Sequence, residues 1–178
     1  MNNLTLCVRQ KASTFFPSVL TTLYLALFTV SSLWLLSCQQ NKRDIINEPY
    51  KEKQAQVAKV LEDIFTSAKA KDFEKLNSFH LNSAKFTKFD NAGNLNRQNF
   101  EENRQGEEAV FKAVEGFEYQ LKNVKVDVFD NVAIATFLIS YTAKMQGVPL
   151  ADTARSTLVF IDNEGKWLIT HEHFSKLR

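Results

Sequence analysis

The chain has 178 residues, of which 22 are Lys or Arg and 20 are Asp or Glu, so its formal charge at pH 7 is +2. The excess comes from Arg9 and Lys11 in residues 1–37, a stretch that contains no acid, and the rest of the chain is formally neutral. A neutral chain lacks the clustered cations that neutralise phosphates, which argues against nucleic acid as a partner. The cysteines are Cys7 and Cys38 alone, which excludes a cysteine-based zinc cluster and, after residue 38, an internal disulfide.

The amino-terminal segment has the pattern of an export signal. An apolar run from Phe15 to Leu36 follows the two basic residues, and polarity rises directly after Cys38. A basic start, an apolar middle and a small residue before a cleavage point are typical of secretory signals. The segment Leu35-Leu36-Ser37-Cys38 resembles the bacterial lipobox. We therefore predict a lipoprotein signal peptide over 1–37 and lipid attachment at Cys38, which would anchor the protein to a membrane of the bacterial cell envelope.

Two alternatives to this lipoprotein signal remain open. The apolar run is about 22 residues long, enough for an uncleaved membrane helix, although Pro17 and scattered Ser and Thr weaken that interpretation. An ordinary secretory signal is the other alternative, but it leaves the cysteine at the end of the run unexplained. The polar residues that follow predict a short flexible tether over 38–50, and 51–178 then form one domain.

Helical periodicity dominates the first half of this domain. Apolar residues recur on one face after Pro49, which predicts a long amphipathic helix over 49–70. This stripe consists of Val57, Leu61, Ile64, Phe65 and Ala68. Asp72 is a typical N-cap for a second, short helix. A short strand around Phe86 and Phe89, turn residues at 90–94 and a third helix over 98–113 complete the pattern.

From Phe117 onward the apolar residues recur with a period of two. Turn residues separate four alternating runs, which predicts an antiparallel meander. The predicted strands are 117–128, 131–145, 153–162 and 166–175. Because helices come first and strands afterwards, we expect an α+β domain with the helices on one face of the sheet.

The alternation also predicts which side chains face the helices. In 131–145 the odd-numbered positions past Asn131 are almost wholly apolar and should point inward. In 117–128 the apolar parity changes midway, which predicts a β-bulge near Lys122-Asn123. In the last strand, the face with Trp167, Ile169, His171 and His173 is the expected inner one, because the opposite face contains Thr170 and Glu172.

The closing segment Gly165-Lys166-Trp167-Leu168-Ile169-Thr170-His171-Glu172-His173-Phe174-Ser175, with the preceding strand Thr157–Phe160, is a recognisable pattern. It resembles the SnoaL-like branch of the nuclear-transport-factor-2-like superfamily, over roughly residues 52–178. The resemblance implies a cone-shaped, curved antiparallel sheet wrapped around the N-terminal helices, with a pocket at its open end. It also implies a homodimer through the outer sheet face. Members include isomerases and cyclases as well as ligand-binding and assembly domains, so the fold alone does not decide function.

Six residues are candidates for the pocket and its ligand: Tyr119, Tyr141, Arg155, Trp167, His171 and His173. Imidazoles on a pocket wall can hold a polar ligand or move a proton near neutral pH. Five of these candidates have a structural alternative: histidines bonded to backbone or Glu groups, tyrosines packed in the core, and an arginine that is a solvated charge at a strand end.

No metal site, cofactor or complete catalytic set is expected. His80, the third histidine, lies near the end of a distant short helix, and zinc needs at least three ligands. Asp90 belongs to a turn, and the buried stripe of the first helix carries Phe65 but no tyrosine, which counts against isomerase-type chemistry. We predict a membrane-tethered module that binds a small, partly apolar molecule or dimerises. The alternatives are an isomerase, dehydratase or cyclase with His171 or His173 as acid or base, and a purely structural assembly domain.

Overall fold

The computed structural model of the protein describes residues 44–90 and 96–177. The predicted signal peptide and Cys38 therefore lie outside the described residues. No helix within those two ranges combines the length and the hydropathy needed to cross a bilayer. Residues 44–50 of the predicted tether contain a local turn, in which Asp44 accepts hydrogen bonds from the backbone N–H groups of Ile46 and Asn47.

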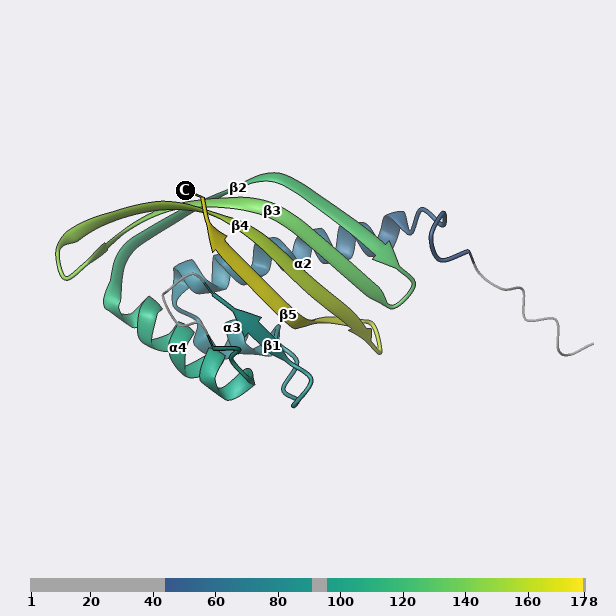
Figure 1. Cartoon of the computed structure of the whole chain (residues 1–178), viewed down its shortest axis with the longest axis horizontal. Coiled ribbons are helices and arrows are strands. Elements are labelled where there is room, and N and C mark those ends of the chain that lie inside the picture. The colour runs from purple at the N-terminus through teal and green to yellow at the C-terminus, as the bar shows by residue number, and fades with distance from the viewer. Residues whose placement is uncertain (1–43, 91–95, 178) are drawn as a thin grey trace, which may run out of the picture. The chain divides into compact units, whose positions relative to one another are not determined.

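Among the described residues, three helices precede most of the strands, which confirms the predicted α+β class (Figure 1). The elements in chain order are α2 (Lys51–Ala70), α3 (Phe73–Ser78), β1 (Thr87–Phe89), α4 (Phe100–Ala113), β2 (Val114–Phe129), β3 (Val132–Met145), β4 (Val148–Asn163) and β5 (Lys166–Lys176). The apolar stripe predicted for the first helix is buried along α2. Asp72 caps α3 as expected, because its side chain accepts a hydrogen bond from the backbone N–H of Lys75.

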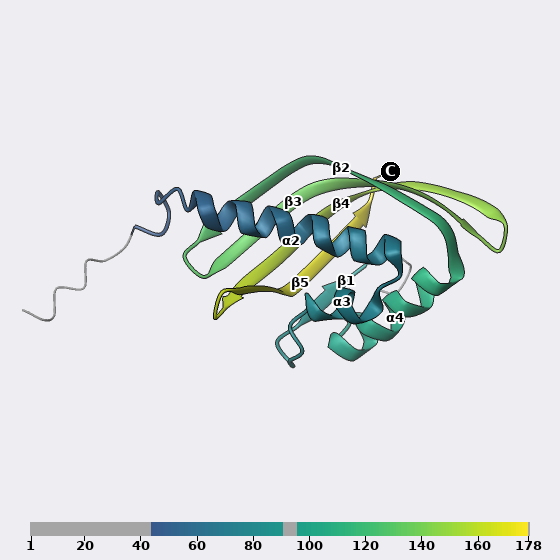
Figure 2. The same ribbon diagram turned by 180° about the vertical axis from the view of Figure 1, so that it is seen from behind.

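The strands form one five-stranded sheet in the order β1-β5-β4-β3-β2. Strands β2 to β5 are the predicted antiparallel meander, and β1 adds to β5 in parallel. The sheet curves, with α2 lying across one of its faces (Figures 1 and 2). The core between them includes Val57 and Leu61 of α2, Ala135 of β3 and Leu158 of β4.

The loop predicted between the second and third strands is shorter than expected. Gln146 and Gly147 both have positive φ, 49° and 79°, and make a tight two-residue turn. Paired positive φ values suit the right-handed twist of a hairpin. The strand β4 therefore begins at Val148, five residues before the predicted start at 153.

At a β-bulge, the inward-facing positions of a strand change between odd and even residue numbers. The predicted bulge in β2 is confirmed, because the register with β3 shifts between Lys122 and Lys125, and Asn123 has a φ of 53°. The inward parity predicted for β3 is also confirmed: Ala133, Ala135, Phe137, Ile139 and Ala143 are all buried.

A bulge in β5 was not predicted, and it changes the site. Val159 of β4 pairs with His171, whereas the next residue, Phe160, pairs with Ile169. Thr170 is thus an extra residue on β5, and the inward parity switches after it. Trp167 and Ile169 face the core as expected, but beyond the bulge the even-numbered Glu172 is the buried residue. The prediction that His171 and His173 face inward was wrong.

Candidate functional site

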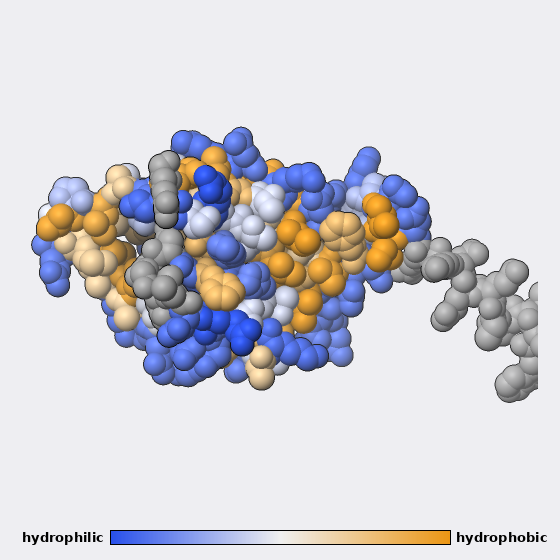
Figure 3. Space-filling view, in the orientation of Figure 1, coloured by the Kyte–Doolittle hydropathy of each residue, from blue (hydrophilic) through white to orange (hydrophobic). Residues whose placement is uncertain are grey.

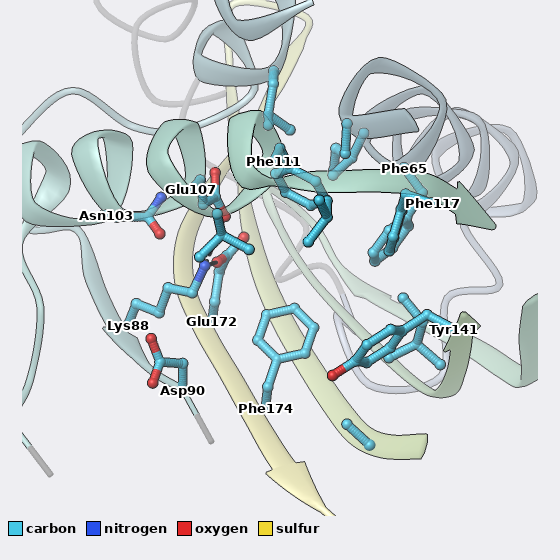
Figure 4. A pocket seen from close by; sticks show the side chains of 18 of the residues that line it. Phe65, Lys88, Asp90, Asn103, Glu107, Phe111, Phe117, Tyr141, Glu172 and Phe174 are labelled. Atoms are coloured by element: carbon cyan, nitrogen blue, oxygen red, sulfur yellow. Dashed lines mark hydrogen bonds and ion pairs between the residues drawn. The ribbon is translucent and has the colours of Figure 1, made fainter. Parts of the chain in front are cut away.

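A cavity of about 450 Å³ lies between the helices and the inner face of the sheet. This volume falls within the range typical of small-molecule sites. Its walls are mostly apolar and come from α2, α4 and strands β2 to β5, with Phe65, Phe111, Phe117, Tyr141 and Phe174 among the lining residues (Figure 4). The cavity can therefore enclose a molecule with a largely apolar body.

Charged side chains gather at one end of the cavity (Figure 4). The ammonium of Lys88 lies 2.7 Å from Glu107 Oε1 and 2.8 Å from Glu172 Oε2. His80 Nε2 lies 3.0 Å from Glu172 Oε1 and 3.9 Å from Glu107 Oε2. We call these four residues the ion cluster. The pairing of β1 with β5 assembles it, because Lys88 stands directly opposite Glu172 in that register.

The hydrogen bonds of His80 indicate that its ring carries two protons. Its Nδ1 lies 3.1 Å from the carbonyl oxygen of Leu76, and its Nε2 faces the carboxylate of Glu172. A carbonyl and a carboxylate only accept hydrogen bonds, so both ring nitrogens must donate. With His80 as an imidazolium, the ion cluster holds two positive and two negative charges, and its formal charge is zero.

The pKa shifts agree with this protonation. Burial by itself lowers the pKa of His80, but the charge and hydrogen bond of Glu172, with the charge of Glu107, outweigh burial and raise it above its usual value. Burial likewise works against the ionised forms of Lys88 and Glu172. The two carboxylates nonetheless raise the pKa of Lys88, and Lys88 with His80 lowers the pKa of Glu172 to about 2. Lys88 and Glu172 are therefore held ionised and are poorly matched to proton transfer near neutral pH.

Three residues of the ion cluster also meet a simple geometric criterion for metal binding. One ligand atom from each of His80, Glu107 and Glu172 lies within 4.8 Å of the others. The ammonium of Lys88 already contacts both carboxylates, however, and a metal ion would have to displace it. The two carboxylates are therefore better explained as partners of the Lys88 ammonium than as ligands of a metal ion.

Helix α4 contributes the remaining polar wall. Its N-terminus is fixed by a capping box in which Asn99 and Glu102 bond each other's backbone N–H groups. One turn later, Asn103 lines the cavity and is 1% exposed, and neither its Nδ2 nor its Oδ1 has a hydrogen-bond partner within the described residues. Gly106 also lines the cavity, and a Cβ built there meets no atom within 4 Å.

Of the six predicted pocket residues, Tyr141 lines this cavity. Tyr119 does not, because its hydroxyl donates to Glu62 and lies 3.2 Å from the hydroxyl of Thr66. Trp167 is a core residue, whose indole N–H donates to Gln56 of α2. Tyr119 and Trp167 thus have structural roles: Tyr119 packs against the core, as the alternative for the tyrosines predicts, and Trp167 is part of the core.

The other three predicted residues lie on the outer side of the sheet. Arg155 is exposed, because Ala154 and Ser156 take the inward positions of β4. The Thr170 bulge turns His171 and His173 outward, where both rings contact Phe89 and His171 Nδ1 lies 2.8 Å from the Thr87 hydroxyl. These positions correct the sequence-based assignment of all three to the pocket.

Sequence reasoning missed the ion cluster. His80 was set aside as distant, yet α3 ends so that its ring meets β5. One signal was available: Lys88 comes two residues after the buried Phe86, and residues two apart in extended chain point to the same face. The charge of Glu172 predicts a solvent-facing residue, but a charged side chain can be fully buried when it is paired, as Glu172 is here.

The curved sheet, the helices on its inner face and the cavity between them define an α+β fold of the nuclear-transport-factor-2-like class. A family model described as "SnoaL-like domain" matches residues 57–178, and the chain belongs to this family. No match was found among curated proteins.

Solved structures show the same fold at low identity. A candidate dehydratase of the NTF2-like family from Streptomyces avermitilis is 18% identical, with a TM-score of 0.66, and the match covers 72% of this chain and 98% of that one. An NTF2-like superfamily protein from Salmonella enterica is 16% identical, with a TM-score of 0.63 and coverages of 70% and 91%. The association domain of C. elegans CaMKII is 17% identical, with a TM-score of 0.57 and coverages of 70% and 96%.

Proposed function

We propose that this protein is a non-catalytic, lipid-anchored module that binds a small, partly apolar molecule in the cavity. The observation that supports this most is the cavity itself: about 450 Å³ with apolar walls, ending in an ion cluster whose charges are mutually paired. A hollow of this size leaves core atoms without contacts, which costs stability unless a ligand fills it.

The arrangement of ionisable groups favours binding over turnover. A general acid or base needs a pKa near the working pH and a reactant within reach. His171 and His173, the acid–base candidates of the enzyme alternative, face away from the cavity, and Lys88 and Glu172 are held ionised inside it. The family contains both enzymes and binding domains, so this distinction rests on the site of this chain.

Gly106 provides a direct test of the binding proposal. In Gly106→Phe the ring enters the open space beside α4 and fills part of the cavity. The neutral fluorophore N-phenyl-1-naphthylamine is the probe, since its emission rises in apolar surroundings. We expect saturable binding to the wild-type domain and at least ten-fold weaker binding to the variant. The matched control is Val124→Phe, an exposed β2 position away from the cavity. Equal binding by Gly106→Phe and the control would contradict the proposal.

We also propose that the chain is exported and tethered through Cys38, as its amino-terminal sequence predicts. Two or more acyl chains at one residue anchor a protein stably, whereas a single chain does so marginally. Mass spectrometry of the mature protein should find Cys38 as the first residue, with acyl mass added. A mature chain that begins at Met1, or at a residue other than 38, would contradict this proposal.

A homodimer through the outer sheet face is a further proposal, and one surface feature supports it. Apolar residues form a band over the central strands in the space-filling view (Figure 3). In the register, Ile134 pairs with Val159, and Ile161 pairs with both Val132 and Leu168, so outward-facing apolar side chains adjoin one another. Light scattering should report a dimer that becomes a monomer in Val159→Lys. A wild-type monomer at tens of micromolar would contradict it.

A further inference from the structure

The chemistry of the polar end indicates which head group the cavity accepts, provided that the proposed ligand binding holds. Four charged side chains line the cavity within the described residues: the cation Lys88 and the carboxylates Asp90, Glu107 and Glu172. A ligand carboxylate that approached Lys88 would also approach Glu107 and Glu172, which already occupy its ammonium at 2.7 and 2.8 Å. Like-charge repulsion and loss of water therefore disfavour an anionic ligand.

A cationic head group meets a different obstacle. The place between the carboxylates of Glu107 and Glu172 is taken by the Lys88 ammonium, and Glu172 is also bonded to His80. A ligand ammonium would leave water for a cluster whose charges are already balanced, and neither carboxylate of the cluster is left to pair with it alone. The remaining carboxylate of the lining, Asp90, already accepts a hydrogen bond from Gln98 Nε2. Burying a charge without its own partner is costly.

Hydrogen-bonding atoms without partners among the described residues remain on α4, one residue of which belongs to the ion cluster and one of which lies beside it. Asn103 is buried, and both its donor Nδ2 and its acceptor Oδ1 lack partners among residues 44–90 and 96–177. One helical turn along α4, Glu107 Oε2 also has no hydrogen-bond partner in those ranges and lies 3.9 Å from His80 Nε2. Residues four apart share a helix face, so two acceptors and one donor stand together at this end of the cavity (Figure 4).

From these observations we infer that the ligand is an uncharged molecule with an apolar body and a head group that both donates and accepts hydrogen bonds, such as a carboxamide. The head group lies against Asn103 and Glu107, with its carbonyl accepting from Asn103 Nδ2 and its N–H groups donating to Asn103 Oδ1 and Glu107 Oε2. The body lies along the aromatic wall that includes Phe111 and Phe174.

Three probes with one chain length and different head groups test this inference. Octanamide, octanoate and octylammonium are titrated at pH 7 into the domain by calorimetry. We expect octanamide to bind at least ten-fold more tightly than either charged probe. Asn103→Leu keeps the size of the side chain and removes its polar atoms. It should reduce the preference for octanamide to less than three-fold and raise the melting temperature of the free domain, because a buried unpaired amide is removed.

The outcomes separate this inference from the proposed binding function. Equal affinity for the three probes, or tighter binding of octanoate or octylammonium, overturns the inference while cavity binding stands. Binding of the fluorophore without binding of any octyl probe also overturns it. If neither the fluorophore nor an octyl probe binds, the proposed function fails and the inference fails with it. A fall in the melting temperature of Asn103→Leu, with the octanamide preference intact, assigns Asn103 a structural role and contradicts the proposed contact.

Discussion

Lys88 is the residue on which the polar end of the cavity depends. It is nearly inaccessible to solvent, and it holds Glu107 and Glu172 together from a three-residue strand. Breaking a buried ion pair by removing one partner leaves an uncompensated charge in a medium that solvates it poorly. The cluster thus ties β1, α4 and β5 to one another as well as forming the wall of the cavity.

Lys88→Met should lower the free energy of unfolding by about 3–5 kcal/mol, because two carboxylates lose their shared cation. Urea denaturation of the mature domain at pH 7 measures this. Lys125→Met is the control, since the Lys125 side chain is 70% exposed beside Asp127, and a change within about 0.5 kcal/mol is expected there. Similar values for the two variants would show that the cluster does not hold the fold together.

The protonation of His80 predicts a pH dependence with a definite sign. Its pKa is raised by folding, so its contribution to stability is complete below its unfolded value near 6.5 and is lost as the pH rises through the folded value. The groups facing it are Glu172, Glu107 and Lys88. Glu172 has a lowered pKa, so its contribution is present above about 4.5 and is lost as the pH falls toward 2. We expect a stability maximum between these limits.

The variant His80→Gln tests the alkaline side of this maximum. Glutamine can donate to Glu172 but does not titrate, so the decline in stability between pH 6.5 and 9 should disappear while the acid decline remains. Urea unfolding across pH 3–9 provides the comparison. A wild-type protein whose stability does not fall above pH 6.5 would contradict the doubly protonated ring.

At the scale of elements, helix α4 contains a glycine that helix propensity disfavours and that lines the cavity. Gly106 lies in its middle, where glycine is unfavourable, and the space beside its Cα is open cavity. Glycine at this position makes the helix less stable, but the missing side chain leaves space in the cavity for a ligand. Gly106→Ala should therefore raise the free energy of unfolding by about 1 kcal/mol.

Thermal and urea denaturation of Gly106→Ala give the value. Gly165→Ala is the contrasting variant, because Gly165 has a φ of 86° in the β4–β5 turn, where an L side chain is strained. That variant should be less stable than wild type. A loss of stability in Gly106→Ala would mean that the space beside α4 is not free.

The elements also show where sequence reasoning succeeded and where it failed. The helix stripe of α2 and the alternation in β3 were predictable, because a period of 3.6 or 2 directly reports which side chains are buried. The β2 bulge was predictable as well, since the apolar parity visibly changes there. In β5 the sequence Thr170-His171-Glu172-His173 contains polar residues on both faces, so no apolar parity marks the bulge. The charge of Glu172 then favoured the prediction that its face of β5 is the outer one, and this prediction was wrong.

At the scale of the whole molecule, the α+β class and the meander followed from the order of the patterns, and the family resemblance is confirmed. The site was not predictable in this way, because its four charged residues come from the segment directly after α3 and from β1, α4 and β5, which are far apart in sequence. Their meeting depends on the parallel pairing of a three-residue strand with β5, and such a short strand carries almost no sequence signal.

The cavity, and not the outer sheet face, is the proposed binding site. Methyl-labelled NMR of the mature domain during titration with N-phenyl-1-naphthylamine tests it most directly. We predict shifts at Ile64, Ile139 and Leu158, which line the cavity, and none at Val159 or Ile161 of the outer face. Shifts confined to Val159 and Ile161, or no shifts at saturating probe, would contradict the account.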